Sequence, residues 1–500
     1  MGYLGFHCGE AHPPEPPNAY IHCDRQESDQ PSWYSLKLQP LLSLCLVSKR
    51  LLNIVQPILY HDFMPGYGDS WRSDIYAWDR RLTSFMRTVA HRRDLAALVK
   101  RIYIHPYLIQ KFSGEKGIME YDPMWHRDIF KVVRAEERKS IGEDEAQDTL
   151  RDVAHALGIQ ELQQLSVHDL VTVLIRELPN LDRCSFQIGP YHEEIVRRAG
   201  LCATGISGLS IRTIDISLRA TSLSATHGNL FDLGRCANTL LNASTSLKTL
   251  NLHMCKGISR RTPFPSLPNL ESLRLTYSRL SERELEGLLG SCNSLRRFHY
   301  EATYCPFTGY NSSYDCSDHF QLSNAVGYLA RHRATLESLH FDLRCRGHSQ
   351  DGPDHRAVFS FKEFTSLKHI FLNLDEFHTR FWAGHPAEDP ELFVRLIPHS
   401  IESVHLAGRI TDQLPRLEGS LLGLAEAVSR GRFPSLREVR WDRNEKVNCE
   451  LTVSAIFTDA GVSFAYASWP LTQSTLGDDR KSPLPNYLDP FPLPDSESDL

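Results

Sequence analysis

The sequence has no run of apolar residues long enough to cross a bilayer, and residues 1–10 lack the basic start and apolar core of a signal peptide. It also lacks an excess of basic residues, since the formal net charge is −6. Phosphate recognition needs a basic surface, so a nucleic-acid binder is disfavoured. We therefore expect a cytoplasmic or nuclear protein that binds neither membrane nor nucleic acid.

The 12 cysteines include no Cys-x-x-Cys pair. In a reducing compartment most of them are expected to be small buried apolar residues. Also absent are a Gly-rich phosphate loop, an HExxH pair and a GxSxG elbow, each of which carries a specific chemistry. These absences predict no catalytic residues, no cofactor and no metal site, and hence a protein that is not an enzyme.

What the sequence does contain is a repeat, apolar-x-x-apolar-x-apolar, often preceded by Pro-Asn or Thr-Ser. Successive copies from Leu181 onward begin 23 to 41 residues apart, a period typical of leucine-rich repeats with insertions. One such unit cannot bury its own leucines, whereas stacked neighbours share one long core. Ten copies are present, and they begin at Val99, Leu181, Ile211, Leu247, Leu270, Leu295, Leu336, Leu367, Ile401 and Leu436.

Helix-like segments separate the copies. Residues Ser281–Gly290 carry Ser281 and Glu284 at capping-box spacing, and Leu421–Ser429 is a second example. Strand, helix and strand at this period predict parallel strands inside and helices outside. The expected fold class is therefore an α/β leucine-rich-repeat solenoid, and the alternative is a set of ordinary strands in an α/β domain.

The repeats suggest five regions. Residues 1–35 and the acidic, Pro-rich residues 471–500 are expected to be disordered. Between them we expect a helical segment at 36–65, a helical cap or linker at 66–98, and the solenoid at 99–470. Long insertions near 301–320, 344–357 and 376–389 should lie on one rim of the solenoid, and the first carries the aromatic residues Tyr304, Phe307, Tyr310 and Tyr314.

Residues Pro40–Val55 are predicted to form one amphipathic helix that Pro57 ends. The stretch LLSLCLVSKRLLNIVQPILYHDF, Leu41–Phe63, resembles the second half of an F-box. The segment Arg87–Ile104 resembles the start of the repeats in fungal F-box proteins with leucine-rich repeats. The Leu-Pro-x-Glu helix that opens an F-box has no counterpart upstream, so the F-box-like segment is expected to be partial.

The resemblance implies a substrate receptor of a Skp-cullin-F-box ubiquitin ligase, whose F-box binds the Skp-type adaptor and whose repeats bind a client protein. The alternatives are a scaffold or sensor with no ligase coupling, and a helical segment that only caps the first repeat. By matching positions the resemblance assigns these residues to the F-box and its adaptor contact: Leu41, Leu42, Leu44, Val47, Leu51, Leu52, Pro57 and Leu59.

A client is expected on the strand face opposite the leucines. Ten strands at about 4.8 Å spacing span about 45 Å, and a strip about 15 Å wide gives roughly 700 Å², near the ~800 Å² per partner of a protein interface. Six histidines on this face (among them His105 and His253) indicate either a pH-sensitive surface or an ordinary polar one. The candidate client-binding residues are Arg101, Tyr103, Arg274, Arg297, His299, His340, His369, Phe371, His405 and Arg440.

Overall fold

The computed structural model describes residues 33–63, 78–104, 155, 167–188, 195–196, 201, 208–218, 230–258, 262–303, 320–344, 359–373, 386–408, 414–442 and 446–467. In these residues the chain is an α/β protein built on one open sheet of 12 parallel strands. The strands follow one another across the sheet in their order along the chain, an arrangement compatible with a solenoid.

Ten of the strands are the ten copies found in the sequence, and each begins two residues after the first apolar position of its copy. Two strands were not predicted, the short β1 at one edge and β12 at the other. The strands are β1 Asp62–Phe63, β2 Arg101–Ile104, β3 Arg183–Ile188, β4 Thr213–Leu218, β5 Thr249–His253, β6 Ser272–Ser278, β7 Arg297–Ala302, β8 Ser338–Asp342, β9 His369–Asn373, β10 Ser403–Ala407, β11 Glu438–Asp442 and β12 Ser463–Ala467.

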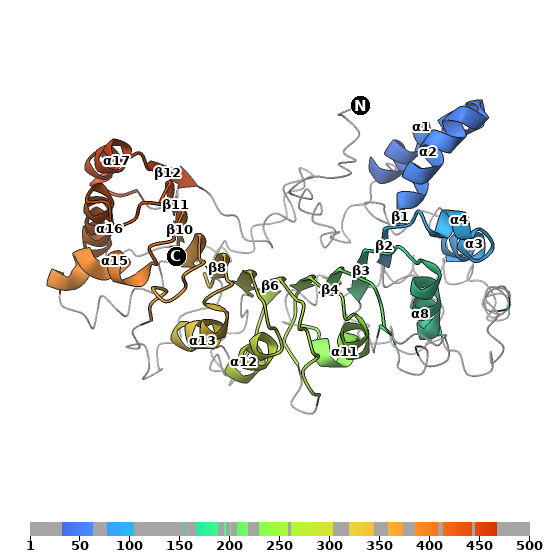
Figure 1. The fold of residues 1–500 in the computed structure, drawn as a ribbon, viewed down its shortest axis with the longest axis horizontal. Coiled ribbons are helices and arrows are strands. Elements are labelled where there is room, and N and C mark those ends of the chain that lie inside the picture. The colour runs from blue at the N-terminus through green and yellow to red at the C-terminus, as the bar shows by residue number, and fades with distance from the viewer. Residues whose placement is uncertain are drawn as a thin grey trace, which may run out of the picture.

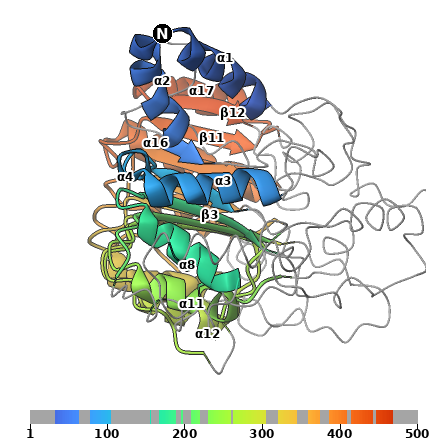
Figure 2. The same cartoon turned by 90° about the vertical axis from the view of Figure 1, so that its right-hand side faces the viewer.

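Helices run along the outer side of the curved sheet, and the inner side carries no helix in the described part of the chain (Figures 1 and 2). A parallel strand pair requires such a return path, because the chain must travel back before it pairs again. The helices are α1 Trp33–Val47, α2 Lys49–His61, α3 Trp78–His91, α4 Arg93–Ala96, α8 Val167–Glu177, α11 Leu233–Ala243, α12 Glu282–Gly290, α13 Leu322–Leu329, α15 Leu392–Leu396, α16 Leu414–Ser429 and α17 Glu450–Asp459, with 3-10 turns η5 Ala330–His332 and η7 Pro386–Glu391.

The apolar positions of the repeats lie side by side in the core. Leu250 pairs with Leu273, and the register continues strand by strand to Leu339 and Val439. A fully buried leucine stabilises the fold by about 1.5–3 kcal/mol, so this row is a large part of the stability. Its members are each at most 1% exposed: Leu250, Leu273, Phe298, Leu339, Ile370, Val404 and Val439.

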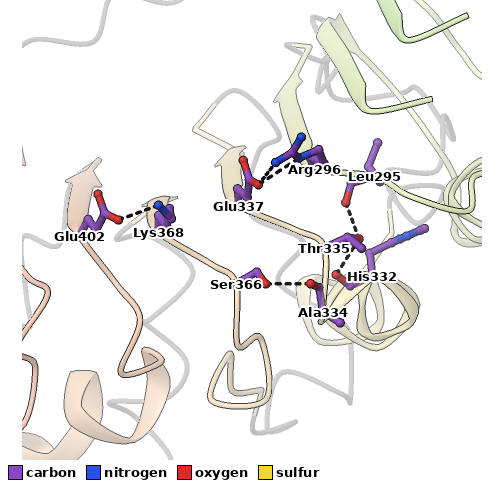
Figure 3. A network of polar contacts seen from close by, with 9 residues as sticks. All are labelled: Leu295, Arg296, His332, Ala334, Thr335, Glu337, Ser366, Lys368 and Glu402. Atoms are coloured by element: carbon purple, nitrogen blue, oxygen red, sulfur yellow. Dashed lines mark hydrogen bonds and ion pairs between the residues drawn. The ribbon is translucent and has the colours of Figure 1, made fainter. Parts of the chain in front are cut away.

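A repeating hydrogen-bond pattern sets the register where the chain enters each strand. The carbonyl of Lys248 accepts the backbone N–H groups of both Glu271 and Ser272, each at 2.9 Å, and the next repeats do the same. The polar residue that precedes a copy adds a side-chain link, as where the Ser366 hydroxyl donates to the carbonyl of Ala334 at 2.7 Å (Figure 3). The asparagines of the Pro-Asn dipeptides form equivalent links, since the side-chain amide of Asn180 donates to the carbonyl of Ala97 and that of Asn269 to the carbonyl of Thr245, each at 2.8 Å.

The predicted capping box is present at the start of α12. The Glu284 carboxylate accepts the backbone N–H of Ser281 at 2.8 Å, as the capping-box spacing indicates. Burial raises the pKa of the Cys236 and Cys292 thiols to about 12, which agrees with the prediction of buried apolar cysteines.

The predicted start of the first insertion, at residue 301, was wrong. Strand β7 extends through Ala302, because its pairing with β8 continues to Glu301, so the insertion begins later.

Candidate functional site

Helices α1 and α2 form a hairpin at the N-terminal end of the sheet (Figure 1). The single helix predicted for Pro40–Val55 is wrong, because the chain is extended at Ser48 (φ −160°, ψ 155°). There the Ser48 hydroxyl accepts the backbone N–H of Leu51 at 3.2 Å and so begins a second helix. The prediction that Pro57 ends the helix is also wrong: Pro57 lies inside α2, where it removes one backbone hydrogen bond.

The hairpin exposes large apolar side chains. The exposed fractions are 89% for Leu46, 70% for Val47, 54% for Leu42, 54% for Ile54 and 40% for Leu44. In the part of the chain that the structure describes, the other exposed large apolar side chain is Leu451 on α17. So many exposed large apolar side chains on one short hairpin indicate an interaction site.

The F-box-like residues fall into two groups. Leu42, Leu44, Val47 and Pro57 are exposed. Leu41 is buried, and Leu51, Leu52 and Leu59 are half-buried, so these four are at least partly covered by the protein itself.

The end of the core is covered by α3 more than by the hairpin. Phe85, Met86 and Val89 of α3 belong to the continuous core, and the ring of Phe63 stacks on that of Phe85 at 3.6 Å. The buried residues of the hairpin, Leu41 and Val55, are not part of that core. This weighs against a hairpin that only caps the first repeat.

The candidate client-binding residues occupy two adjacent rows of the inner face. In the first row, Arg101 pairs with Arg183 on β3. Farther along the same row, Arg297 pairs with Ser338, and Ser338 pairs with His369. The second row contains Tyr103, whose side chain lies outside the described residues, and then, from β6 to β11, Arg274, His299, His340, Phe371, His405 and Arg440. We call these two rows, from β6 to β11, the inner strip.

On β3 to β5 the inner face is a closed ionic network. The fully buried Asp215 carboxylate accepts from Arg183 Nε at 2.6 Å and Nη2 at 3.1 Å. It also accepts from the Ser185 hydroxyl and the Asn251 amide, each at 2.6 Å. A buried carboxylate needs this degree of hydrogen bonding, so these residues support the fold.

At the centre of the inner strip three rings are stacked. The ring centroids of His299 and His340 lie 3.9 Å apart, and those of His340 and Phe371 also lie 3.9 Å apart, with interplanar angles of 13° and 9°. Arg274 neighbours the stack on one side and His405 on the other. Stacked rings of this kind attract one another, so the three side chains support each other's positions.

Four histidines of the inner face are neutral at physiological pH, namely His253, His299, His340 and His405. Burial lowers the pKa of His340 to about 3 and that of His253 to about 4. Burial also lowers the pKa of His299 and of His405. Of the two hypotheses for these histidines, a sensor working near pH 6–7 is therefore disfavoured, because their protonation needs stronger acid.

A buried ionic link joins distant strands. Arg344, which follows β8, pairs with Asp342 at 2.6 Å, and its Nη1 lies 4.0 Å from Asp442 Oδ2 on β11. Asp442 also accepts the backbone N–H of Gly408 at 2.9 Å. Side chains three strands apart meet because the sheet curves toward its inner side, as Figure 1 shows.

A ladder of charges follows the edge where the chain enters the strands. Lys248 pairs with Glu271 at 2.7 Å, and Lys368 pairs with Glu402 at 3.0 Å. Between them Arg296 Nε donates to Glu337 at 2.9 Å (Figure 3). The paired charges largely neutralise this edge, so it offers a partner little net charge.

The aromatic residues of the first predicted insertion lie outside the described residues. They are Tyr304, Phe307, Tyr310 and Tyr314. Among the residues that are described, no group of histidine, cysteine, aspartate and glutamate could hold a metal ion. None of the described helices has the length and apolar character needed to cross a membrane.

Comparison with known proteins gives no family. A scan against family models and a search of curated proteins both found no match for this chain. The hairpin and the inner strip are therefore the two features of the molecule that point to a function.

Proposed function

We propose that this chain is a protein-interaction module of the leucine-rich-repeat class, a substrate receptor of a Skp-cullin-F-box ubiquitin ligase. In this proposal the repeats bind a client protein and the hairpin binds the Skp-type adaptor. The chain itself supplies no catalytic residue and acts in the cytoplasm or nucleus.

The observation that carries the proposal is the apolar surface of the hairpin. Leu42, Leu46 and Val47 are more than half exposed, although each side chain would gain about 1.5–3 kcal/mol from full burial. A partner that covers them recovers this free energy, and the resemblance of Leu41–Phe63 to an F-box names the adaptor as that partner. Leu42, Leu44 and Val47 of that stretch lie near the C-terminal end of α1.

The client part of the proposal is supported by the sheet. In the part of the chain that the structure describes, the inner side carries no helix (Figure 1), and the two rows of polar and aromatic residues continue over six consecutive strands, β6 to β11. A long, shallow surface of this kind suits a polypeptide better than a small molecule, which needs an enclosed pocket.

A pull-down with the Skp-type adaptor tests the proposal. The full chain should capture the adaptor, and Leu44→Asp combined with Val47→Asp should abolish capture. Leu451→Asp is the control, because Leu451 is 87% exposed, more than Leu44 or Val47, and lies on α17 at the other end of the sheet. Capture that persists in the double variant would contradict the proposed contact.

The alternative is a scaffold or sensor without ligase coupling. It predicts that the unmodified chain fails to capture the adaptor although it still binds a client through the inner strip. A hairpin that serves another partner would then account for the exposed leucines.

A further inference from the structure

Strand β12 is the last strand of the sheet in the part of the chain that the structure describes (Figure 1). We call the side of β12 that faces away from β11 the β12 edge. At the other end of the sheet, β1 has only two residues and carries Asp62, and short or charged strands protect a sheet edge. Strand β12 has five residues, Ser463–Ala467, with no charge and no proline, so its edge is a template for a further strand.

The backbone groups that lie on the β12 edge follow from the pairing with β11. Ser463 pairs with Glu438, and the N–H of Ser463 donates to the carbonyl of Arg437 at 2.9 Å. The backbone groups of alternate residues point to opposite sides of a strand, so those of Phe464 and Tyr466 point away from β11. Within the described ranges no strand pairs with β12 on that side.

Contacts on the core side hold β12 in place. The ring centroid of Phe464 lies 6.0 Å from that of Phe457 on α17 and 5.7 Å from that of Tyr466. The Tyr466 hydroxyl accepts the backbone N–H of Val447 at 3.3 Å and donates to the Glu450 carboxylate at 3.2 Å. The strand is therefore already ordered before another strand joins it, which lowers the entropic cost of pairing.

The aromatic side chains of β12 lack the cover that the equivalent side chains of β11 have. Phe464 aligns with Val439 and Tyr466 with Trp441. Val439 and Trp441 are 0% exposed, whereas Phe464 and Tyr466 are half-buried, and no further repeat of the described chain stacks on them. A solenoid needs a cover at each end of its core. A strand added at the β12 edge would supply both hydrogen bonds and apolar contact.

From these observations we propose that the β12 edge pairs with the β12 edge of a second copy of the chain. The two strands run antiparallel about a two-fold axis that passes between their Ala465 residues. Phe464 of each copy then faces Tyr466 of the other, and each such pair exchanges both backbone hydrogen bonds. The axis is perpendicular to the sheet, so the helices of both copies lie on the same side of the joined sheet.

The side chains of β12 suit a second copy. Those on the inner side of the sheet are small and uncharged, so two copies can approach without repulsion; they are Ser463, Ala465 and Ala467. On the core side, Phe464 and Tyr466 would form two cross-strand aromatic pairs, a favourable combination in antiparallel sheets. The contact is therefore self-complementary, as a two-fold interface requires.

The sequence that follows β12 is less suited to this edge. Proline has no N–H to donate to a neighbouring strand. Residues 468–500 contain six prolines, which are Pro470, Pro483, Pro485, Pro490, Pro492 and Pro494. A second β12 offers every N–H that the pairing needs.

The predicted dimer is reversible. A contact between two five-residue strands is small beside the ~800 Å² per partner of a stable interface, so we expect a Kd of about 10 μM. The inference uses neither the hairpin nor the inner strip, so it can fail without affecting the proposed function. Each dimer would carry two inner strips, and a client with two binding segments would gain affinity by binding both.

Sedimentation velocity of the full chain, between about 1 and 100 μM, tests the inference. The sedimentation coefficient should rise with concentration toward that of a particle of twice the 57.0 kDa chain mass. Ala465→Lys and Ala465→Asp should each weaken dimerisation at least about tenfold, because like charges would lie directly opposite each other. Ala334→Lys is the matched control, since Ala334 is exposed and lies between η5 and β8.

An equimolar mixture of the two Ala465 variants gives the sharpest test. In the mixed pair a lysine faces an aspartate, so the mixture should dimerise although each variant alone stays largely monomeric. Recovery in the mixture also excludes unfolding of β12 as the cause of the loss, and circular dichroism of each variant checks this independently.

Three results would overturn the inference. A full chain that stays monomeric up to about 100 μM would exclude a second copy and leave the β12 edge to residues 468–500 or to another protein. A dimer that both Ala465 variants retain would place the contact elsewhere on the chain. Folded variants that stay monomeric when mixed would contradict antiparallel pairing about Ala465. Adaptor capture by the hairpin is decided separately by the hairpin variants.

Discussion

Leucine side chains are characteristic of both the α1–α2 hairpin and the sheet, yet their environments are opposite. Leu46 in the hairpin is 89% exposed, whereas Leu273 in the sheet is 0% exposed. In the sheet each leucine meets the equivalent side chains of two neighbouring repeats, so burial follows from stacking. Within the described ranges no neighbouring repeat covers Leu46 of the hairpin, and we propose that another molecule does.

The comparison separates apolar residues that hold the fold together from apolar residues that bind. The same substitution, an apolar residue to aspartate, should therefore have opposite consequences in the two regions. In the sheet it should reduce stability, and in the hairpin it should reduce only binding.

The largest expected effect is that of Leu273→Asp. The change places a carboxylate between Leu250 and Phe298 in a fully buried row, where an unpaired charge costs several kcal/mol. We expect a loss of at least about 4 kcal/mol in the free energy of unfolding, measured by urea denaturation followed by circular dichroism. Denaturation indistinguishable from that of the unmodified chain would show that Leu273 does not lie in the shared core.

Asp215→Ala tests whether the polar inner face of β3 to β5 also supports the fold. Removing the carboxylate leaves the Arg183 guanidinium, whose side chain is only 14% exposed, without its main partner. We expect a loss of about 3–5 kcal/mol in urea denaturation. Asp182→Ala is the control, because Asp182 is half exposed and 3.8 Å from Arg212, and it should cost less than about 1 kcal/mol.

Acid should destabilise the sheet through its neutral histidines. Burial lowers the pKa of His253 to about 4, while an unfolded histidine titrates near 6.5. Below pH 6.5 the unfolded chain binds a proton at His253 that the folded chain does not bind. The free energy of unfolding therefore falls as the pH drops toward 4. This group alone should lower the free energy of unfolding by about 2 kcal/mol between pH 7 and pH 5.

The check is urea denaturation at both pH values for the unmodified chain and for His253→Gln. The glutamine variant keeps a polar group beside the Thr276 hydroxyl, which lies 2.9 Å from His253 Nδ1. The free energy of unfolding of the glutamine variant should fall by about 2 kcal/mol less than that of the unmodified chain between pH 7 and pH 5. An equal fall in both proteins would contradict the assignment of this pH dependence to His253.

The smallest expected effect on stability is that of the hairpin variants. Leu46→Asp and Val47→Asp replace side chains that are already in water, so the free energy of unfolding should change by less than about 0.5 kcal/mol. The same proteins should lose adaptor capture. A large fall in the melting temperature would instead mean that these residues pack within the fold, and the contrast between the two regions would fail.

The repeat pattern was sufficient to predict the strands and their buried positions. The ten copies from Val99 to Leu436 correspond to strands β2 to β11, because alternation along a strand is local and reports directly which face is buried. The capping box at Ser281 was also predictable, since both partners lie within one helical turn. The break at Ser48 was missed because the apolar spacing continues unchanged through it, although a serine between two apolar stretches is a possible N-cap.

What the sequence by itself determined is the identity of the two faces of each strand, because that depends on near neighbours along the chain. The tertiary structure decided which side chains of the inner face meet. The Arg183–Asp215 pair, the His299–His340–Phe371 stack and the approach of Arg344 to Asp442 all depend on register and curvature between residues far apart in the sequence. The exposure of Leu46 is likewise a tertiary property, because an apolar residue is buried only where the fold supplies a neighbour to cover it.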